Sequence, residues 1–206
     1  LHKYDADKKQ LLKEYEVSKI VLFAPTFSPS LTCAPYLLEQ IKELSNNKEY
    51  LIVIKFHDLM AQELITAYKK LAKEISNIIF VEERNIIKYL LISDVMISDT
   101  SSVVYEFLLL DKPVITFKNN SKICQWDNSL TYYGLKESVN ENLTNDPFKE
   151  KRALIVKEYH PYQDGKSSER MVNAVESYIK EFGVPEKRIL PWLRRRKMNK
   201  MFGKHA

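Results

Sequence analysis

The sequence predicts an α/β fold, a parallel β-sheet with helices on both of its faces. Five short runs of β-branched and aromatic residues alternate with stretches of helical periodicity. One of these runs, Tyr50–Lys55, is apolar almost throughout, which is typical of a strand covered on both faces. Repeated right-handed crossovers between such strands give a Rossmann-like sheet, and we expect this arrangement here.

The predicted strands and helices follow one another in regular alternation. The first strand covers residues 19–24 and ends at Pro25, which has no N–H to donate to a sheet. The other predicted strands are residues 50–55, 77–81, 94–98 and 113–117, and the helices between the strands are residues 34–44, 60–75, 86–92 and 102–110.

The sequence after the fifth strand is less regular. Residues 118–147 are polar and rich in Asn and Ser, so we expect a long functional loop region there. Residues 150–158 are a candidate helix, and residues 167–182 form an amphipathic helix that begins at a Ser-Ser-Glu-Arg sequence. The pattern predicts one domain, residues 1–186, followed by a basic extension, residues 187–206.

Composition limits the class of protein. Of the 206 residues, 45% are hydrophobic and 29% are charged, as in an ordinary globular domain. The two cysteines, Cys33 and Cys124, lie far apart, so we expect neither a metal site nor redox chemistry. Apolar runs stop well short of the roughly 18 residues of a membrane span. We therefore expect a cytoplasmic protein, peripheral at most to the inner face of the cell membrane. Because the sequence begins at Leu1 rather than Met, we also expect an excised part of a longer protein.

The positive charge lies at one end of the chain. The formal net charge is +5, but eight Lys and Arg residues and no acid lie in residues 187–206, which leaves residues 1–186 at −3. A nucleic-acid-binding domain typically carries its basic face on the folded body, so we expect no nucleic-acid partner. In the extension, apolar residues are interleaved with the cations, which fits an anionic membrane surface or, as the alternative, contact with another domain.

The strongest candidate site follows the fourth strand. Ligands of parallel sheets bind at the carboxyl ends of the strands, and here Asp99, Thr100, Ser101 and Ser102 connect the strand to a helix. Hydroxyls and unpaired N–H groups at a helix start attract an anion, and a diphosphate would fit. Plain capping of the helix is the alternative interpretation.

Two further residues are candidates for the same site. Glu106 lies one helical turn beyond Ser102, where its carboxylate could accept hydrogen bonds from a ribose; a Glu that faces solvent is the alternative. His57 follows the second strand, where it could donate to a phosphate or act as acid or base near neutral pH. For His57 the alternative is a structural hydrogen bond.

Several common catalytic and binding motifs are absent from the sequence. It contains four glycines and neither a GxGxxG nor a GxxxxGK[ST] phosphate loop. HExxH and EF-hand patterns are also absent, and no Ser-His-Asp triad can be assigned. We therefore expect neither a cofactor nor a metal ion.

Four segments carry a resemblance to a known family: residues 20–27, 55–57, 89–117 and 164–170. At these residues the chain resembles the C-terminal half of the CDP-glycerol glycerophosphotransferase family, of the teichoic-acid polymerase type. The resemblance implies a GT-B architecture, in which two Rossmann-like domains face a cleft. In that architecture the C-terminal domain holds the cytidine nucleotide and pyrophosphate, while the N-terminal domain contributes the acceptor side and a histidine base.

Carried over by motif position, the resemblance gives each candidate residue a role. Thr100, Ser101 and Ser102 would hold the donor pyrophosphate, His57 would contact phosphate and help the leaving CMP, and Glu106 would lie beside the ribose. The family usually has Tyr at the position of Thr100, Pro at that of Asp58 and often Asp at that of Glu106.

The expected function is that of the donor-binding half of a glycerophosphotransferase. Such an enzyme transfers polyol phosphate from CDP-glycerol, or a related CDP-polyol, to a cell-surface polymer acceptor and releases CMP. Without the N-terminal domain, the chain alone is expected to be inactive. The alternatives are a nucleotide-sugar glycosyltransferase or UDP-N-acetylglucosamine 2-epimerase-like domain of the same architecture, and a non-catalytic nucleotide-binding module.

Overall fold

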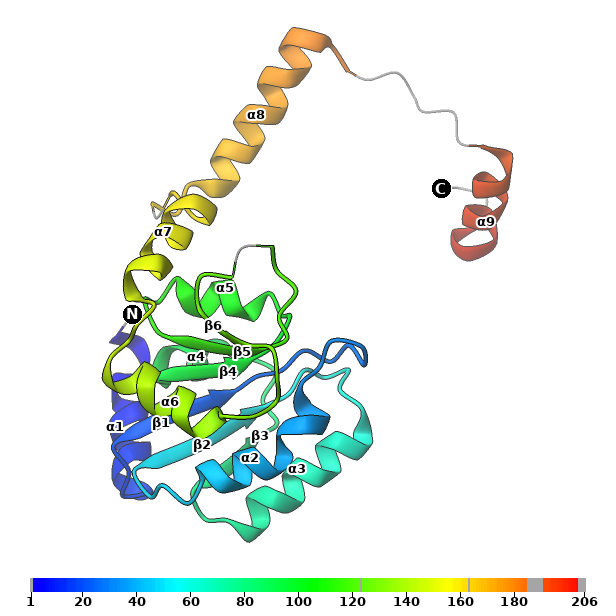
Figure 1. The fold of residues 1–206 in the computed structure, drawn as a ribbon. Coiled ribbons are helices and arrows are strands. Elements are labelled where there is room, and N and C mark those ends of the chain that lie inside the picture. Colours follow the sequence, from blue (N-terminus) through cyan, green and yellow to red (C-terminus); the bar gives the residue numbers. More distant parts are fainter. Residues whose placement is uncertain (1, 123, 163, 185–190, 204–206) are drawn as a thin grey trace. The chain divides into compact units, whose positions relative to one another are not determined.

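The structure is a computed structural model that describes residues 2–122, 124–162, 164–184 and 191–203 (Figure 1). It comprises two compact units, residues 1–161 and residues 162–206. The first unit contains the six-stranded β-sheet, and the described residues of the second form two helices.

A six-stranded parallel sheet with the order β3-β2-β1-β4-β5-β6 forms the centre of the first unit. Every neighbouring pair of strands is parallel, so all the strands end at the same edge. The strands are β1 (Lys19–Phe23), β2 (Tyr50–Lys55), β3 (Ile78–Val81), β4 (Val95–Ser98), β5 (Val114–Phe117) and β6 (Asp127–Ser129). The first five confirm the predicted strands to within one residue at each end.

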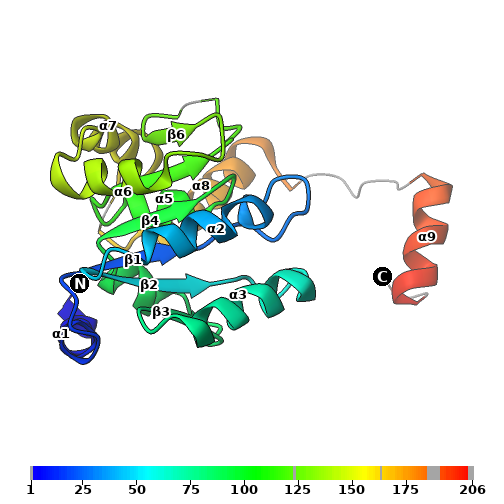
Figure 2. The same cartoon turned by 60° about the horizontal axis from the view of Figure 1, so that its bottom comes forward.

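Helices cover both faces of the sheet (Figure 1, Figure 2). Alternate residues of β1 lie on opposite faces: Val21 and Phe23 belong to one core cluster, and Ile20 and Leu22 belong to the other. The first cluster is covered by α2 (Ala34–Leu44), α3 (Gln62–Glu74) and α6 (Leu135–Thr144). The second is covered by α1 (Asp5–Glu14), α4 (Ile87–Ile92), α5 (Val103–Leu108) and α7 (Lys149–Tyr159), and η1 (His2–Tyr4) precedes α1. The predicted Rossmann-like α/β class is therefore confirmed.

The expectation of a long loop over residues 118–147 was wrong, because the structure has β6 and α6 there. Strand β6 is polar and pairs partly through side chains: Asn128 Oδ1 accepts a hydrogen bond from Thr116 Oγ1 at 2.8 Å and one from the backbone N–H of Asn119 at 3.0 Å. Helix α6 buries Leu135 and Val139 at a spacing of four residues. Short, mostly polar elements of this kind have little hydrophobic periodicity to reveal them.

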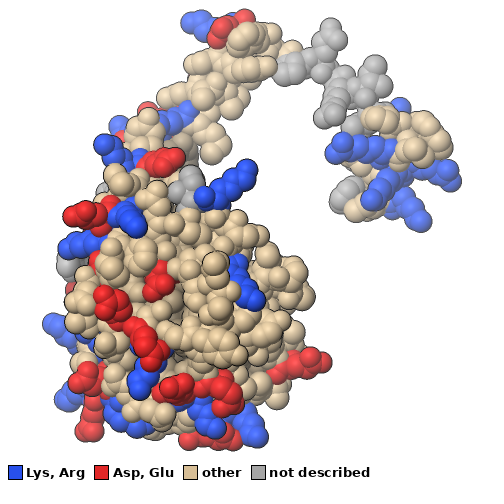
Figure 3. All heavy atoms as spheres, in the orientation of Figure 1, with Lys and Arg blue, Asp and Glu red and all other residues tan. Residues whose placement is uncertain are grey.

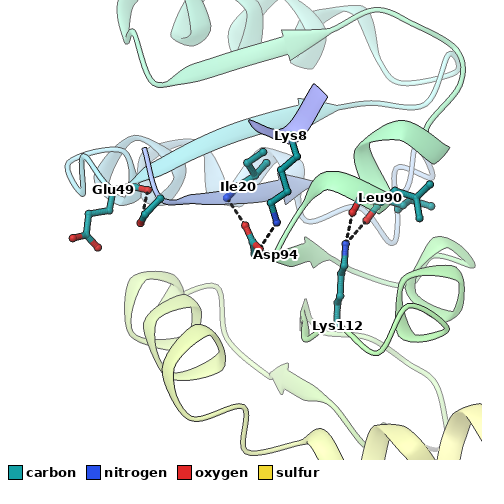
Figure 4. A network of polar contacts seen from close by, with 8 residues as sticks. Lys8, Ile20, Glu49, Leu90, Asp94 and Lys112 are labelled. Carbon is teal, nitrogen blue, oxygen red and sulfur yellow. Dashed lines mark hydrogen bonds and ion pairs between the residues drawn. The ribbon is translucent and has the colours of Figure 1, made fainter. Parts of the chain in front are cut away.

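Polar contacts fix the edge of the sheet at which the strands begin (Figure 4). The carboxylate of Asp94 accepts hydrogen bonds from Lys8 Nζ at 2.6 Å and from the backbone N–H of Ile20 at 2.8 Å. Lys112 Nζ donates to the carbonyls of Leu90 and Leu91, at the end of α4. Burial, together with the nearby Lys8, lowers the pKa of Lys112 to about 8.

The second unit contains α8 (Ser167–Phe182) and α9 (Trp192–Phe202). Helix α8 has the predicted bounds, and just before it Asp164 pairs with Arg170, whose guanidinium lies 3.9 Å from the ring centre of Tyr162. Lys and Arg side chains gather on α9, whereas acids and bases alternate over the visible face of the first unit (Figure 3). Among the described helices, none combines the length and the apolar character needed to cross a bilayer.

Candidate functional site

A pocket of about 240 Å³ lies at the edge where the parallel strands end. Its wall is built from residues that follow β1, β2, β3 and β4. Strands β1 and β4 are neighbours in the sheet, although the chain passes through β2 and β3 before it returns to β4. The crossover connections therefore run in opposite directions on the two sides of the β1–β4 pair. Such a position is the topological switch point, at which open α/β sheets bind ligands.

Asp99, the first residue after β4, joins two loops at this edge of the sheet. Its side chain is buried, and its two oxygens accept hydrogen bonds from the backbone N–H groups of Thr26 and Cys33, both at 2.8 Å. The Asp99 carbonyl accepts a third hydrogen bond, from Asn119 Nδ2 at 2.7 Å. Burial raises the pKa of the Asp99 carboxyl, although the two N–H donors favour its ionised form. The carboxylate thus holds the loop after β1 against the turn after β4.

The two serines of this turn have hydroxyls without a protein partner. Ser102 occupies the N-cap position of α5 with φ −65° and ψ −26°, and its side chain makes no capping hydrogen bond. Within the described residues, neither the Ser101 nor the Ser102 hydroxyl is hydrogen-bonded. The structure therefore does not have the capping arrangement that was the alternative for this turn. Both serines line the pocket, where a ligand can reach them.

Two contacts orient the imidazole of His57, which also lines the pocket. Its ring packs against that of Phe27 in a tilted arrangement, with the ring centroids 4.5 Å apart and the planes inclined by 32°. Its Nδ1 accepts a hydrogen bond from the backbone N–H of Leu59 at 3.1 Å. Because Nδ1 is the acceptor, the proton of the neutral ring lies on Nε2, which makes Nε2–H a hydrogen-bond donor for a ligand.

The structure separates the remaining two predicted residues. Glu106 lies in the first turn of α5 and lines the pocket, one helical turn beyond Ser102. Thr100 is not part of the pocket wall, and its Oγ1 accepts a hydrogen bond from the backbone N–H of Asn120 at 3.2 Å. Thr100 thus contacts the loop after β5, whereas the other four predicted site residues share one pocket.

The sequence analysis gave no role to two basic residues of the pocket wall. Lys55, the last residue of β2, is only 5% exposed, and its Nζ donates to the Phe56 carbonyl at 2.7 Å. Arg84 follows β3 and pairs with Asp58, with 3.0 Å between Nε and Oδ2. The position of both residues at strand ends was the signal that could have identified them.

The pocket therefore has the chemistry of an anion-binding site. Two serine hydroxyls and the Nε2–H of His57 supply neutral donors, and basic side chains lie in the same wall. Glu106 adds a carboxylate, a hydrogen-bond acceptor, to the same wall. Within the described residues, no three His, Cys, Asp or Glu side chains gather as a metal ion would require.

A family model described as CDP-glycerol:poly(glycerophosphate) glycerophosphotransferase matches residues 1–177. Among curated proteins, the chain is similar to the teichoic acid glycerol-phosphate primase of Bacillus subtilis (strain 168). The two are 27% identical over 198 residues, which cover 85% of this chain and 49% of the primase. The chain spans about half the length, or less, of the curated relatives it matches.

Two solved structures are similar in fold. The wall teichoic acid polymerase TagF has a TM-score of 0.61 and 18% identity, over 87% of this chain and 48% of that chain. The structure of S. aureus MnaA with UDP has a TM-score of 0.62 and 16% identity, over 91% of this chain and 53% of that chain. At such identities the similarity extends to the fold alone, and it agrees with the Rossmann-like class.

Proposed function

The chain belongs to the CDP-glycerol:poly(glycerophosphate) glycerophosphotransferase family, and from this premise we propose that it is the donor-binding part of a polyol-phosphate transferase. The donor is CDP-glycerol, or a related CDP-polyol such as CDP-ribitol. The acceptor is a cell-surface polymer, and the second product is CMP. Residues 1–186 form the donor domain in this proposal.

The group of free donors on one pocket wall is the observation that supports this proposal most. The hydroxyls of Ser101 and Ser102 have no partner among the described residues, and His57 directs its single acceptor, Nδ1, to the Leu59 N–H. A donor diphosphate would accept hydrogen bonds from the two hydroxyls and from Nε2–H. Glu106 would then accept a hydrogen bond from the ribose, and Thr100 would hold the turn through Asn120.

The proposed transfer demands positioning and charge stabilisation more than covalent chemistry. The acceptor hydroxyl attacks the phosphorus next to the polyol, the bond from that phosphorus to the bridging oxygen breaks, and CMP leaves with the bridging oxygen. Donors already in place hold the diphosphate in line with the acceptor and stabilise the charge that develops on the departing phosphate. In this tautomer His57 acts as a hydrogen-bond donor, so the proton of the acceptor hydroxyl goes to a different base.

The acceptor side lies, in our proposal, outside the present chain. The chain covers 49% of the B. subtilis primase, so a second domain of comparable size has room in such a protein. By resemblance to the GT-B architecture, that N-terminal domain would contribute the base, a histidine, and the polymer site. The donor half alone would bind nucleotide without turnover.

The basic extension, residues 187–206, is assigned to a surface contact. Its described helix α9 combines exposed apolar side chains, among them Trp192 and Leu193, with Lys and Arg residues (Figure 3). An anionic membrane at the inner face of the cell would attract such a helix. The N-terminal domain is the alternative partner.

A nucleotide-sugar enzyme of the same architecture is the second candidate function. The fold similarity to S. aureus MnaA, which was solved with UDP, favours it. A non-catalytic nucleotide-binding module is the third candidate, and a full-length protein without a second Rossmann-like domain would support it.

Activity of the full-length protein tests the proposed function. CMP release from CDP-glycerol should require a polymer acceptor. The His57→Ala variant should release CMP more slowly, because the donor to the phosphate is lost. A full-length protein that releases UDP from UDP-sugars and leaves CDP-glycerol intact would contradict the proposal.

A further inference from the structure

Lys55 places a buried positive charge in the pocket wall. It is the last residue of β2, at the sheet edge where His57 and the serines also lie. Its side chain is 5% exposed, and the Phe56 carbonyl, at 2.7 Å, is the single acceptor of its ammonium group among the described residues. An ammonium group has three N–H donors, so two of them have no acceptor within the described part of the chain.

No carboxylate of the described residues lies within ion-pair distance of Lys55. The nearby Asp58 pairs instead with Arg84, at 3.0 Å. Burial lowers the pKa of Lys55, while the charges of Asp58 and Glu83 oppose this effect. A buried charge without a paired counter-charge is costly, and proteins normally pair such groups or place them where a ligand binds.

The other charged residues of the wall make this lysine decisive for an anionic ligand. Arg84 and Asp58 cancel each other, and Glu106 is acidic. Without Lys55, the charged side chains of the wall would therefore sum to −1 and would repel a diphosphate. The hydroxyls of Ser101 and Ser102 and the neutral His57 provide donors but no net charge.

We infer that the Lys55 ammonium is the counter-charge of the diphosphate in this pocket, which makes Lys55 a binding residue for the nucleotide donor. The inference rests on the proposed function, because it takes the diphosphate to be that of a CDP-polyol. When the ligand is bound, the two unused donors of the ammonium are directed to phosphate oxygens. Charge-assisted hydrogen bonds of this kind are among the strongest in proteins.

Substitution of Lys55 by Met tests this role, because Met is apolar and of similar length. Calorimetric titrations with CDP, CMP and cytidine are compared for the wild type, Lys55→Met, Lys55→Arg and Lys136→Met. Lys136 lies on α6 and is exposed, so its variant controls for the change in net charge. We expect Lys55→Met to weaken CDP binding at least tenfold and to leave cytidine binding unchanged. The CDP affinity of Lys55→Arg should lie between those of Lys55→Met and the wild type, and that of Lys136→Met should equal the wild-type value.

Thermal melts distinguish ligand binding from a structural role. Removal of an unpaired buried charge should leave the melting temperature of the ligand-free Lys55→Met protein unchanged or higher. Unchanged CDP affinity in Lys55→Met, or an equal loss for CDP and cytidine, would overturn the inference. If Lys55→Met does not fold, Lys55→Gln replaces it in the titrations. Unchanged CDP affinity, or an equal loss for CDP and cytidine, would overturn the inference in that variant as well.

Inorganic pyrophosphate separates this inference from the proposed function. If the wild type binds no cytidine nucleotide, the proposed donor site is wrong. In that case the role of Lys55 as a counter-charge is tested with pyrophosphate alone. A rise in melting temperature with pyrophosphate in the wild type, and none in Lys55→Met, supports the counter-charge. Equal behaviour of the two proteins refutes it.

Discussion

The double variant Ser101→Ala, Ser102→Ala should lose affinity for CDP while it keeps its stability. Each hydroxyl would donate to a charged phosphate, and a hydrogen bond to a charged group contributes roughly 1.5–3 kcal/mol. The double variant removes both hydroxyls, so at about 1.4 kcal/mol per factor of ten the CDP affinity should fall by about two to four orders of magnitude. Neither hydroxyl makes a hydrogen bond within the described residues, so the free energy of unfolding should change by less than about 0.5 kcal/mol.

Calorimetric titration of the folded variants with CDP and cytidine is the appropriate assay, with thermal melts beside it. Ser76→Ala serves as the matched control, because Ser76 is exposed and lies between α3 and β3, away from the pocket. His57→Ala should weaken CDP binding much more than cytidine binding, since the Nε2–H of His57 donates to phosphate in the proposal. If CDP affinity is unchanged in both the double variant and His57→Ala, the phosphate site is refuted. A loss of about 1 kcal/mol of stability per serine, with CDP affinity intact, would instead identify helix caps.

Three further predictions concern stability and surface contacts. The side chain of Arg152 is 1% exposed and pairs with Asp111 and Asp146. Arg152→Met should therefore lower the free energy of unfolding, measured in urea titrations, by about 3 kcal/mol. A loss below about 1 kcal/mol would contradict a stabilising role of these ion pairs. The pKa of Lys112 is about 8 in the folded state against an ordinary 10.5, so Lys112 binds fewer protons in the folded protein than in the unfolded chain between these pH values. The free energy of unfolding of the wild type, relative to that of Lys112→Met, should therefore rise from pH 8 to 10.5. If this relative stability stays constant or falls, the lowered pKa is refuted. The whole chain should co-sediment with anionic liposomes more strongly than residues 1–186, because each cation near an anionic surface contributes about 1 kcal/mol to binding. Equal binding of the two forms would eliminate a lipid-binding role of the extension.

The strands were predictable because their burial leaves a direct trace in the sequence. All six residues of Tyr50–Lys55 are buried, which is why this run is apolar almost to its end. Once the strands are known to be parallel, their ends must lie at one edge. This rule was sufficient to place His57, Ser101, Ser102 and Glu106 near one another from the amino-acid sequence alone.

The features that were missed depend on contacts between distant residues. The carboxylate of Asp99 could have capped the helix beside it, and only the structure reveals that it accepts the N–H groups of Thr26 and Cys33, more than sixty residues away. The hydroxyl of Thr100 likewise contacts Asn120 rather than the pocket. The position of Lys55 at a strand end is visible in the sequence, but neither its burial nor its lack of an ion pair among the described residues can be inferred from the local sequence.

The central claim, that this pocket binds a cytidine nucleotide donor, is tested most directly by a nucleotide panel on the unmodified chain. Calorimetric titration would compare CDP-glycerol, CDP and cytidine with UDP and UDP-N-acetylglucosamine under identical salt conditions. We predict that CDP-glycerol and CDP bind more tightly than either uridine ligand, and that cytidine binds more weakly than CDP because it lacks the diphosphate. Tighter binding of the uridine ligands, or equal binding of cytidine and CDP, would contradict the account.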